Sequence, residues 1–355
     1  MAGQRIGVVT TGGDAPGLNA VIRAIVKAAY QSETEPEIRG YRDGMEGVME
    51  RRWLRLTPDS IKGILPRAGT MLGAGTRVNP FNVGGVDQSE LAMQELRELD
   101  VLMILGGNGS MALGHALHTR YGLPVIGIPK TIDNDVVGTD MTFGFDSAVM
   151  AATEAIDRLH ATAEAHHRVF VVETMGRDVG WIALYAGIGG GADVILMPEV
   201  PFSIDRVAET IRWRDASGRR FTIVVVAEGA RPREGEPCYS MEGERRRYGG
   251  IATWLAGQLS ARVDQDVRPI QLGHIQRGVE PTARDRRLAT ALGAHAVELA
   301  RDGHAGCMVA LRGNQITKVP LDEVQGVRRV TPDDPLYRTG ISIGISYCGQ
   351  PVEGR

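Results

Sequence analysis

The sequence has little of what marks secreted, membrane-spanning or nucleic-acid-binding proteins. Among its 355 residues there are only three cysteines, Cys238, Cys307 and Cys348, which lie far apart and form neither a CxxC pair nor a zinc-ligand spacing. This scattered, odd set favours a reduced compartment over a secreted one. No basic leader precedes the strand predicted at residues 5–9, and no apolar run approaches the roughly 20 residues of a membrane span. The expected localisation is cytoplasmic.

The sequence also lacks an excess of positive charge. Forty lysines and arginines stand against 43 aspartates and glutamates, for a net charge of −3. Such a chain has no overall positive field to attract nucleic acid or a membrane, so neither partner is expected. P-loop, GxSxG and HExxH motifs are absent as well, which argues against P-loop NTPases, α/β-hydrolases and zinc proteases. Basic residues must then act locally, in a pocket.

Glycine, by contrast, is abundant. It accounts for 46 of the 355 residues, which is about 13% against a usual value of about 7%. The glycines cluster after short apolar runs, and these runs alternate with amphipathic segments of helical period. Such alternation predicts an α/β protein with mainly parallel sheets flanked by helices, and the length suits two lobes.

The expected strands and helices cover most of the chain. The interval 36–60 is expected to hold a strand at 37–41 and a loop, the charged stretch 230–249 a solvated loop, and the tail from 319 has no clear pattern. The predicted strands are 5–9, 101–105, 125–128, 168–172, 194–197, 222–227 and 308–311, and the predicted helices are 18–26, 89–99, 110–116, 147–165, 181–186, 201–213, 251–263 and 282–301.

Polar or glycine residues recur directly after these strands. In open α/β sheets, ligands bind outside the carboxyl ends of the strands, so these residues are expected to converge on a site. They are Gly13, Asn108, Lys130, Asp133, Arg177 and Glu228.

The densest group of charges is Pro129-Lys130-Thr131-Ile132-Asp133-Asn134-Asp135. Phosphoryl transfer needs cations for the migrating charge, a metal ion, and a group that takes the proton of the acceptor. Asp133 and Asp135 suit the base and metal roles. One guanidinium group can bind two phosphate oxygens at once. The candidate cations are Arg77, Lys130, Arg168, Arg177, Arg268 and Arg277.

Several long motifs occur in one order: TGGDAPGLNAVIRA, PKTIDNDVVGTDMTFGFDSA, VVETMGRDVGWIA, VVAEG and LGHIQRG. With them, residues 4–310 resemble the bacterial family of 6-phosphofructokinases, which phosphorylate the 1-hydroxyl of fructose 6-phosphate with ATP-Mg²⁺ or, in some members, pyrophosphate. The resemblance implies two Rossmann-like lobes. A larger donor-binding lobe would comprise residues 1–138 and about 280–330, a smaller sugar-phosphate lobe about 139–279, and a tail 331–355.

The resemblance also implies roles for individual residues. Asp133 would accept the proton, Thr131 would contact the transferred phosphoryl group, and Arg177 would be a third catalytic residue that contacts the substrate. Magnesium would be held near Asn108 and Asp135. The donor would be lined by Gly13, Arg77, Gly107, Asn108, Gly109 and Ser110. The sugar phosphate would be bound by Thr131, Ile132, Asp133, Arg168, Met175, Gly176, Arg177, Glu228, Arg268, His274, Ile275, Gln276 and Arg277.

The implied donor depends on two positions. Pyrophosphate-using relatives carry Asp at the position of Gly109 together with Lys at the position of Lys130. A carboxylate there would repel the α-phosphate of ATP, and Gly109 leaves the space open. Lys130 with glycine matches an ATP-using branch with the PKTIDND motif, so ATP is the expected donor and pyrophosphate the alternative.

Three further expectations follow from the resemblance. Arg168 and Arg268 come from a neighbouring subunit in many members, which implies a homodimer or homotetramer with shared active sites. Arg23 and Lys27 lie where allosteric members carry a basic effector pair, although a solvated helix surface explains them equally well. Asn108 replaces the usual Asp or Glu, so weakened magnesium binding or a regulatory, sugar-phosphate-binding paralogue is an alternative. A nicotinamide dehydrogenase, suggested by the loose glycine pattern at 107–112, is disfavoured because that pattern lies in mid-chain.

Overall fold

The computed structural model describes residues 3–75, 78–233, 239–242 and 245–348. Contacts along the chain define two compact units. Unit 1 comprises Met1–Ser147 and Arg277–Val327, and unit 2 comprises Ala148–Gln276 and Arg328–Arg355. These boundaries differ from the predicted ones, mainly because residues after 327 pack with unit 2. The donor and sugar-phosphate roles of the two lobes stay predictions.

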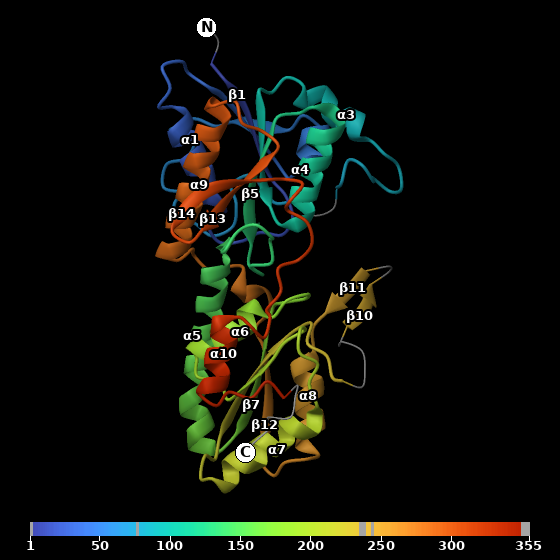
Figure 1. Ribbon diagram of the computed structural model, residues 1–355, viewed down its shortest axis with the longest axis vertical. Coiled ribbons are helices and arrows are strands. Elements are labelled where there is room, and N and C mark those ends of the chain that lie inside the picture. Colours follow the sequence, from blue (N-terminus) through green and yellow to red (C-terminus); the bar gives the residue numbers. More distant parts are fainter. Residues whose placement is uncertain (1–2, 76–77, 234–238, 243–244, 349–355) are drawn as a thin grey trace. The chain divides into compact units, whose positions relative to one another are not determined.

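Unit 1 is built on one mainly parallel sheet (Figure 1). The inner strands are almost continuously apolar and fully buried, as expected for parallel strands covered on both faces. Its strands lie in the order β14 (Gln315–Pro320), β13 (Cys307–Arg312), β5 (Val125–Thr131), β4 (Val101–Gly106), β1 (Arg5–Thr10), β2 (Glu37–Tyr41) and β3 (Trp53–Arg55), and β6 (Phe143–Gly144) pairs with the end of β5. Only β14 and β3, at the two edges, pair in the antiparallel direction.

Helices cover both faces of this sheet. On one face α1 (Leu18–Ala29) packs against α9 (Ala283–Arg301), and on the other lie α3 (Ser89–Leu96) and α4 (Asn108–Tyr121) (Figure 1). The large apolar residues of α1 recur at helical spacing and are fully buried, which fits an amphipathic helix facing a core. A short helix, α2 (Met45–Met49), lies between β2 and β3.

Unit 2 contains a smaller, wholly parallel sheet in the order β12 (Val267–Gln271), β7 (Val169–Thr174), β9 (Thr222–Ala227) and β8 (Val194–Leu196). Its helices are α6 (Trp181–Gly189), α7 (Ile204–Ala216), α8 (Ile251–Ser260) and α10 (Pro335–Ser342), with a 3₁₀ turn, η1, at Gly273–Gln276. The long helix α5 (Phe145–His166) begins in unit 1 and continues in unit 2. The predicted fold class, two mainly parallel sheets flanked by helices, is confirmed.

Several local expectations were wrong. The stretch 230–249 is not all loop, because β10 (Tyr239–Glu242) and β11 (Arg245–Tyr248) form an antiparallel hairpin. A two-residue Gly-X link, the signal of a tight hairpin, joins them in the sequence. The interval 36–60 holds α2 and β3 in addition to β2. In the tail from 319, for which no element was predicted, lie the end of β14 and the helix α10. Finally, β5 runs on to Thr131, because Lys130 and Thr131 pair with β6.

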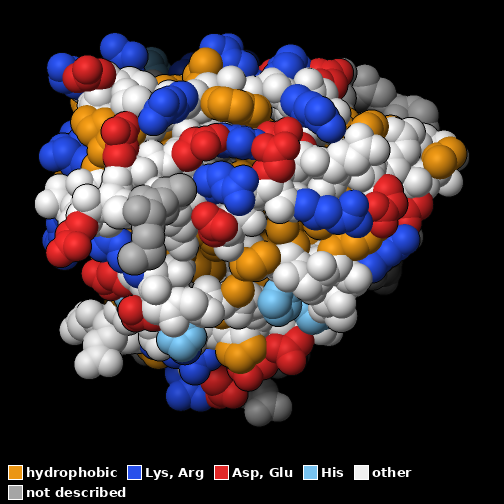
Figure 2. All heavy atoms as spheres, turned by 90° about the horizontal axis from the view of Figure 1, so that it is seen from above, with side chains coloured by type: hydrophobic (Ala, Val, Ile, Leu, Met, Phe, Trp, Pro, Cys, Tyr) orange, Lys and Arg blue, Asp and Glu red, His pale blue; other side chains and the backbone are white. Residues whose placement is uncertain are grey.

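The distribution of charge on the surface agrees with the composition. On the face drawn in Figure 2, positive and negative side chains are interspersed, in keeping with the net charge of −3. Within the described part of the chain, no helix is both long and apolar enough to cross a bilayer.

Candidate active site

A pocket of about 370 Å³ lies in unit 1 at the carboxyl ends of β1, β4 and β5. The sheet order explains its place. The chain runs from β1 to β2 on one side and later returns to β4 on the other, so β1 and β4 flank a topological switch point, where α/β proteins bind ligands. The lining residues are Thr11, Gly12, Gly13, Gly75, Val78, Asn79, Gly107, Asn108, Gly109, Ser110, Leu113, Lys130, Thr131, Asp133 and Arg277.

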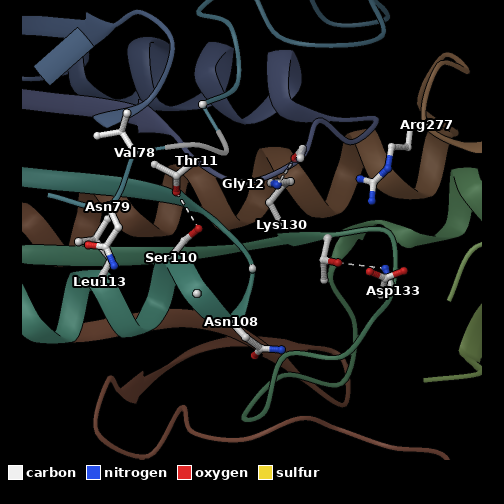
Figure 3. Close-up of a pocket in the computed structure, with 15 residues that line it drawn as sticks. Thr11, Gly12, Val78, Asn79, Asn108, Ser110, Leu113, Lys130, Asp133 and Arg277 are labelled. Atoms are coloured by element: carbon white, nitrogen blue, oxygen red, sulfur yellow. Dashed lines mark hydrogen bonds between the residues drawn. The ribbon is translucent and has the colours of Figure 1, made fainter. Parts of the chain in front are cut away.

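The pocket has two chemically different ends. Figure 3 shows Lys130, Asp133 and Arg277 toward one end, and Val78, Asn79 and Leu113 toward the other. The first end carries two cations and a carboxylate, and the second includes two aliphatic side chains. The pocket is therefore suited to a ligand with a phosphate part and a less polar part.

The start of α4 forms one wall of the pocket. The helix begins at Asn108 without a side-chain cap at Gly107 and without an acidic residue in its first turn. An uncapped helix start presents backbone N–H groups and a partial positive charge, which together bind phosphate. Within this wall, Gly109 is open: a Cβ atom there would meet nothing within 4 Å.

A buried hydroxyl pair fixes this wall to the end of β1. Thr11 donates from Oγ1 to Ser110 Oγ at 2.7 Å, and its backbone N–H donates to Leu105 O at 2.9 Å. A Cβ on Gly106 would lie only 2.0 Å from Ser110 Oγ, so this contact requires glycine. This hydroxyl pair therefore holds the loop after β1 against the first turn of α4.

Two cations bind the glycine turn after β1. Lys130 is 3% exposed, and its amine donates to the Gly13 carbonyl. Arg277 donates from Nη1 to Asp14 O at 2.7 Å, and a Cβ on Gly13 would lie 2.9 Å from that same nitrogen. Burial, together with the positive charge of Arg277, lowers the pKa of Lys130 to about 8. The turn therefore lies against a concentrated positive charge.

Asp133 lies in a tight turn after β5. Its backbone N–H donates to Thr131 Oγ1 at 3.0 Å, and its side chain is half-buried on the pocket wall. The next residue, Asn134, has φ 54°, a left-handed conformation that asparagine tolerates better than most residues. Its Oδ1 accepts from Thr142 N at 3.0 Å. Asn134 thus fixes the turn that presents Asp133, a role that sequence reasoning missed.

Asn108 and Asp135, the two predicted metal ligands, are in direct contact. Asn108 Nδ2 donates to Asp135 Oδ2 at 2.8 Å and to Asp135 O at 3.2 Å. Because both of these atoms only accept, the amide orientation is fixed, and Asn108 Oδ1 is left buried without a partner. A carbonyl oxygen beside a carboxylate fits a magnesium ion that also takes phosphate oxygens and waters. In the described chain, no three His, Cys, Asp or Glu side chains group closely enough to hold a metal.

In unit 2, four predicted residues lie at the carboxyl ends of two adjacent strands. Met175, Gly176 and Arg177 follow β7, and Glu228 follows β9, its N–H donating to Thr174 O at 2.9 Å. Gly176 has φ 134°, which favours glycine, and its carbonyl accepts from Gly229 N at 3.0 Å. The structure therefore brings these predicted sugar-phosphate residues together.

The LGHIQRG motif is divided between the units. Gly273–Gln276 forms η1 in unit 2, where Ile275 is 61% exposed and Gln276 is buried with its amide donating to Gly273 O at 3.0 Å. Arg277 belongs to unit 1 and lines the pocket described above. Buried Ile132 lies beside Asp133 in the core of unit 1. The predicted donor residue Arg77 lies outside the described residues.

Arg168 and Arg268 lie at the opposite end of the unit 2 sheet from Met175–Arg177. Arg168 precedes β7 and Arg268 is near the start of β12. Both donate from Nε to Asp266 Oδ2, at 3.0 and 2.9 Å. Since β7 is six residues long, about 20 Å separates its two ends. One copy of this sheet therefore does not bring both groups to one small sugar phosphate.

Comparisons with known proteins agree with this geometry. The phosphofructokinase family model matches residues 5–300. An ATP-dependent 6-phosphofructokinase of Chloroflexus aggregans is 50% identical, over 97% of this chain and 98% of its own length. A pyrophosphate–fructose 6-phosphate 1-phosphotransferase of Streptomyces coelicolor is 46% identical, over 97% and 100%. The structure of phosphofructokinase from Saccharomyces cerevisiae superimposes with a TM-score of 0.78 at 30% identity, over 90% of this chain and 45% of the yeast chain. The chain therefore belongs to the phosphofructokinase family.

Proposed function

We propose that this protein is an ATP-dependent 6-phosphofructokinase that converts fructose 6-phosphate and ATP to fructose 1,6-bisphosphate and ADP. The observation that carries the proposal is the pocket in unit 1, where an uncapped helix start, two cations and the Asp133 carboxylate line one cavity. Phosphoryl transfer requires this combination of positioning, positive charge and a proton acceptor. The 50% identity with the Chloroflexus aggregans enzyme supports it.

The reaction uses the residues of this pocket in distinct roles. Asp133 takes the proton of the sugar 1-hydroxyl while that oxygen bonds to the γ-phosphorus of ATP and the bond to the β–γ bridging oxygen breaks, releasing ADP. Lys130 and Arg277 supply positive charge, and the α4 start binds donor phosphates. When bound, Mg²⁺ neutralises phosphate charge, and Asn108 Oδ1 and Asp135 would hold it.

Two observations support ATP as the donor. Open space at Gly109 admits an α-phosphate, and the aliphatic end of the pocket at Val78 and Leu113 suits a nucleoside, for which pyrophosphate has no need. The combination of Lys130 with glycine at 109 also supports placing the chain in the ATP-using branch with the PKTIDND motif. The second candidate is a pyrophosphate-dependent enzyme, which the Streptomyces coelicolor relative favours.

Unit 1 is the donor-binding lobe in this proposal, and unit 2 carries the sugar-phosphate residues. Because Arg168 and Arg268 lie at the far end of the unit 2 sheet, they would bind the 6-phosphate of a site in a second copy of the chain. The enzyme is then a homodimer or homotetramer with shared active sites. It would act in the cytoplasm, in glycolysis, and Arg23 and Lys27 of α1 are the candidates for binding an allosteric effector.

A coupled assay for fructose 1,6-bisphosphate tests the proposal. Purified protein with fructose 6-phosphate and Mg²⁺ is given either ATP or pyrophosphate at equal concentration. We expect a higher kcat/KM with ATP, and a higher value with pyrophosphate would favour the second candidate. Calorimetric binding of fructose 6-phosphate without turnover of either donor would contradict both and support a regulatory paralogue, which the uncharged Asn108 would explain.

A further inference from the structure

Glu173 is a buried carboxylate that no predicted role explains. It is the fifth residue of the six-residue strand β7 and is 2% exposed. Its two oxygens accept from Gly250 N at 3.1 Å each, from Ala252 N at 2.9 Å and from Gln271 Nε2 at 3.0 Å. A carboxylate in this place satisfies donors from two other segments at once. It also stabilises the N-terminal end of α8, which has no side-chain cap of its own.

This carboxylate fixes the glycine pair that precedes α8. Gly249 and Gly250 have φ 127° and 91°, in the region that favours glycine. A Cβ on Gly249 would lie 2.9 Å from Gln271 Nε2 and 3.4 Å from Glu173 Oε1. The backbone at Gly249 therefore lies close to the Glu173 and Gln271 side chains, and this close contact fixes the position of the preceding residue, Tyr248.

Residue 248 in turn contacts a predicted active-site cation. The Tyr248 ring centroid lies 5.5 Å from the guanidinium carbon of Arg177, within the range of a cation–π interaction. Arg177 is exposed on the loop after β7. A long exposed arginine loses considerable rotamer freedom when it is ordered. An aromatic surface beside it reduces the number of orientations that the guanidinium samples before substrate binds.

The same carboxylate also reaches the LGHIQRG motif. Gln271, which donates to Glu173, is the last residue of β12 and precedes η1, and Leu272 N donates to Glu173 O at 3.1 Å. Glu173 therefore joins three segments of unit 2: the loop that carries Met175 to Arg177, the segment that carries Tyr248, and the turn that carries His274.

We propose that Glu173 and Tyr248 are positioning residues that orient Arg177 for the sugar phosphate. Glu173 holds the Gly249–Gly250 backbone, the backbone holds Tyr248, and the ring holds the guanidinium. This inference rests on the proposed function, in which Arg177 contacts substrate. It goes beyond that function because neither residue belongs to the predicted site. A purely structural role can be distinguished from it, since such a role would change stability without changing the kinetics with fructose 6-phosphate.

The experiment compares variants of the full-length enzyme. Tyr248→Leu removes the ring, Tyr248→Phe retains it, and Glu173→Ala removes all of the carboxylate contacts. The matched control is Asp193→Ala, because Asp193 is another hydrogen-bonded carboxylate in unit 2, with a side chain that is 15% exposed. It accepts from Ile223 N at 2.9 Å and Arg214 Nη2 at 2.8 Å, at the start of β8 and so at the other end of the sheet. Melting temperature, kcat and KM for each substrate, and calorimetric binding of fructose 6-phosphate are measured for every variant.

We expect Tyr248→Leu and Glu173→Ala to lower kcat/KM for fructose 6-phosphate about tenfold, equivalent to about 1.4 kcal/mol, with KM for ATP unchanged. Tyr248→Phe should behave like the wild type. Asp193→Ala should lower the melting temperature without this kinetic change. The double variant of Glu173 and Tyr248 should be no worse than the poorer single variant, because both act through Arg177.

Two results would overturn the proposal: equal losses in Tyr248→Phe and Tyr248→Leu, or normal fructose 6-phosphate kinetics in Tyr248→Leu. If Glu173→Ala does not fold, the two Tyr248 variants still decide the matter. If the wild type turns over neither donor, the proposed function fails, and calorimetric binding of fructose 6-phosphate to the wild type and to Tyr248→Leu still tests the positioning role separately.

Discussion

Replacement of Gly109 by aspartate tests donor selection most directly. Gly109 is exposed at the start of α4, and a Cβ there would meet nothing within 4 Å. The substitution should therefore be accommodated without moving the backbone. A carboxylate in the first helical turn is also favourable by about 0.3–1 kcal/mol, and aspartate is a slightly better helix former than glycine. Gly109→Asp should thus fold as well as the wild type or slightly better.

Although Gly109→Asp should not destabilise the protein, it should lower the activity with ATP. At an effective dielectric constant of about 20, two unit charges about 5 Å apart repel by about 3 kcal/mol. If the aspartate lies beside the α-phosphate, that energy lowers kcat/KM for ATP by about two orders of magnitude. Pyrophosphate lacks a third phosphate and should lose much less, so the preference for ATP should fall by a similar factor. Steady-state assays with both donors, with the melting temperature of each protein, measure the effect.

Gly109→Ala is the matched control, because it adds the Cβ atom without the charge. It should keep most of the activity with ATP. If alanine lowers activity as much as aspartate does, steric crowding and not charge is responsible, and the electrostatic explanation is wrong. Unchanged ATP kinetics in Gly109→Asp would show that the α-phosphate does not lie beside this residue.

Three other substitutions test the roles of single carboxyl and amide groups. Asp133→Asn should lower kcat by about 10²–10⁴ while calorimetric binding of fructose 6-phosphate is kept; near-normal turnover would exclude Asp133 as the base. Asn108→Asp places a second carboxylate against Asp135, so the Mg²⁺ concentration for half-maximal activity should fall about tenfold or more, and an unchanged value would place the metal elsewhere. In the folded protein, burial raises the pKa of Asp285 from 3.8 to about 6. The folded state therefore binds more protons between pH 4 and 6, and the free energy of unfolding decreases as pH rises through that window. At pH 7 the ionised group costs about 3 kcal/mol. In urea unfolding, Asp285→Asn, which keeps an oxygen to accept from Ser147 N, should gain stability relative to the wild type from pH 5 to pH 7, and a constant difference would contradict the raised pKa.

The parts of the fold that follow from local pattern were predictable. The strand β4 is a short, uninterrupted apolar run between a helix and a glycine turn, and parallel strands buried on both faces have this composition. The grouping of Gly13, Asn108, Lys130 and Asp133 followed from one rule, that ligands bind at the carboxyl ends of parallel strands. The structure brings all four to one pocket.

What the sequence did not reveal depends on contacts between distant residues. The extension of β5 through Lys130 requires pairing with β6, whose Phe143 lies thirteen positions later in the sequence. The role of Glu173 depends on N–H groups about 80 residues away in the chain, which no local pattern records. Asn134 is the exception, because an asparagine between two aspartates after a strand is a signal for a left-handed turn.

The structure indicates different roles for residues 109 and 130, the two positions that were expected to select the donor together. A lysine next to an ATP phosphate would be expected to reach the ligand directly, but the Lys130 amine is buried and donates to the Gly13 carbonyl. Its charge and its hydrogen bond both act on the glycine turn, which either donor would use. Gly109 instead faces open space in the pocket wall. Of the two positions, only 109 can place a new group beside the part of ATP that pyrophosphate lacks. We therefore expect donor preference to follow residue 109, while Lys130 maintains the turn for either donor.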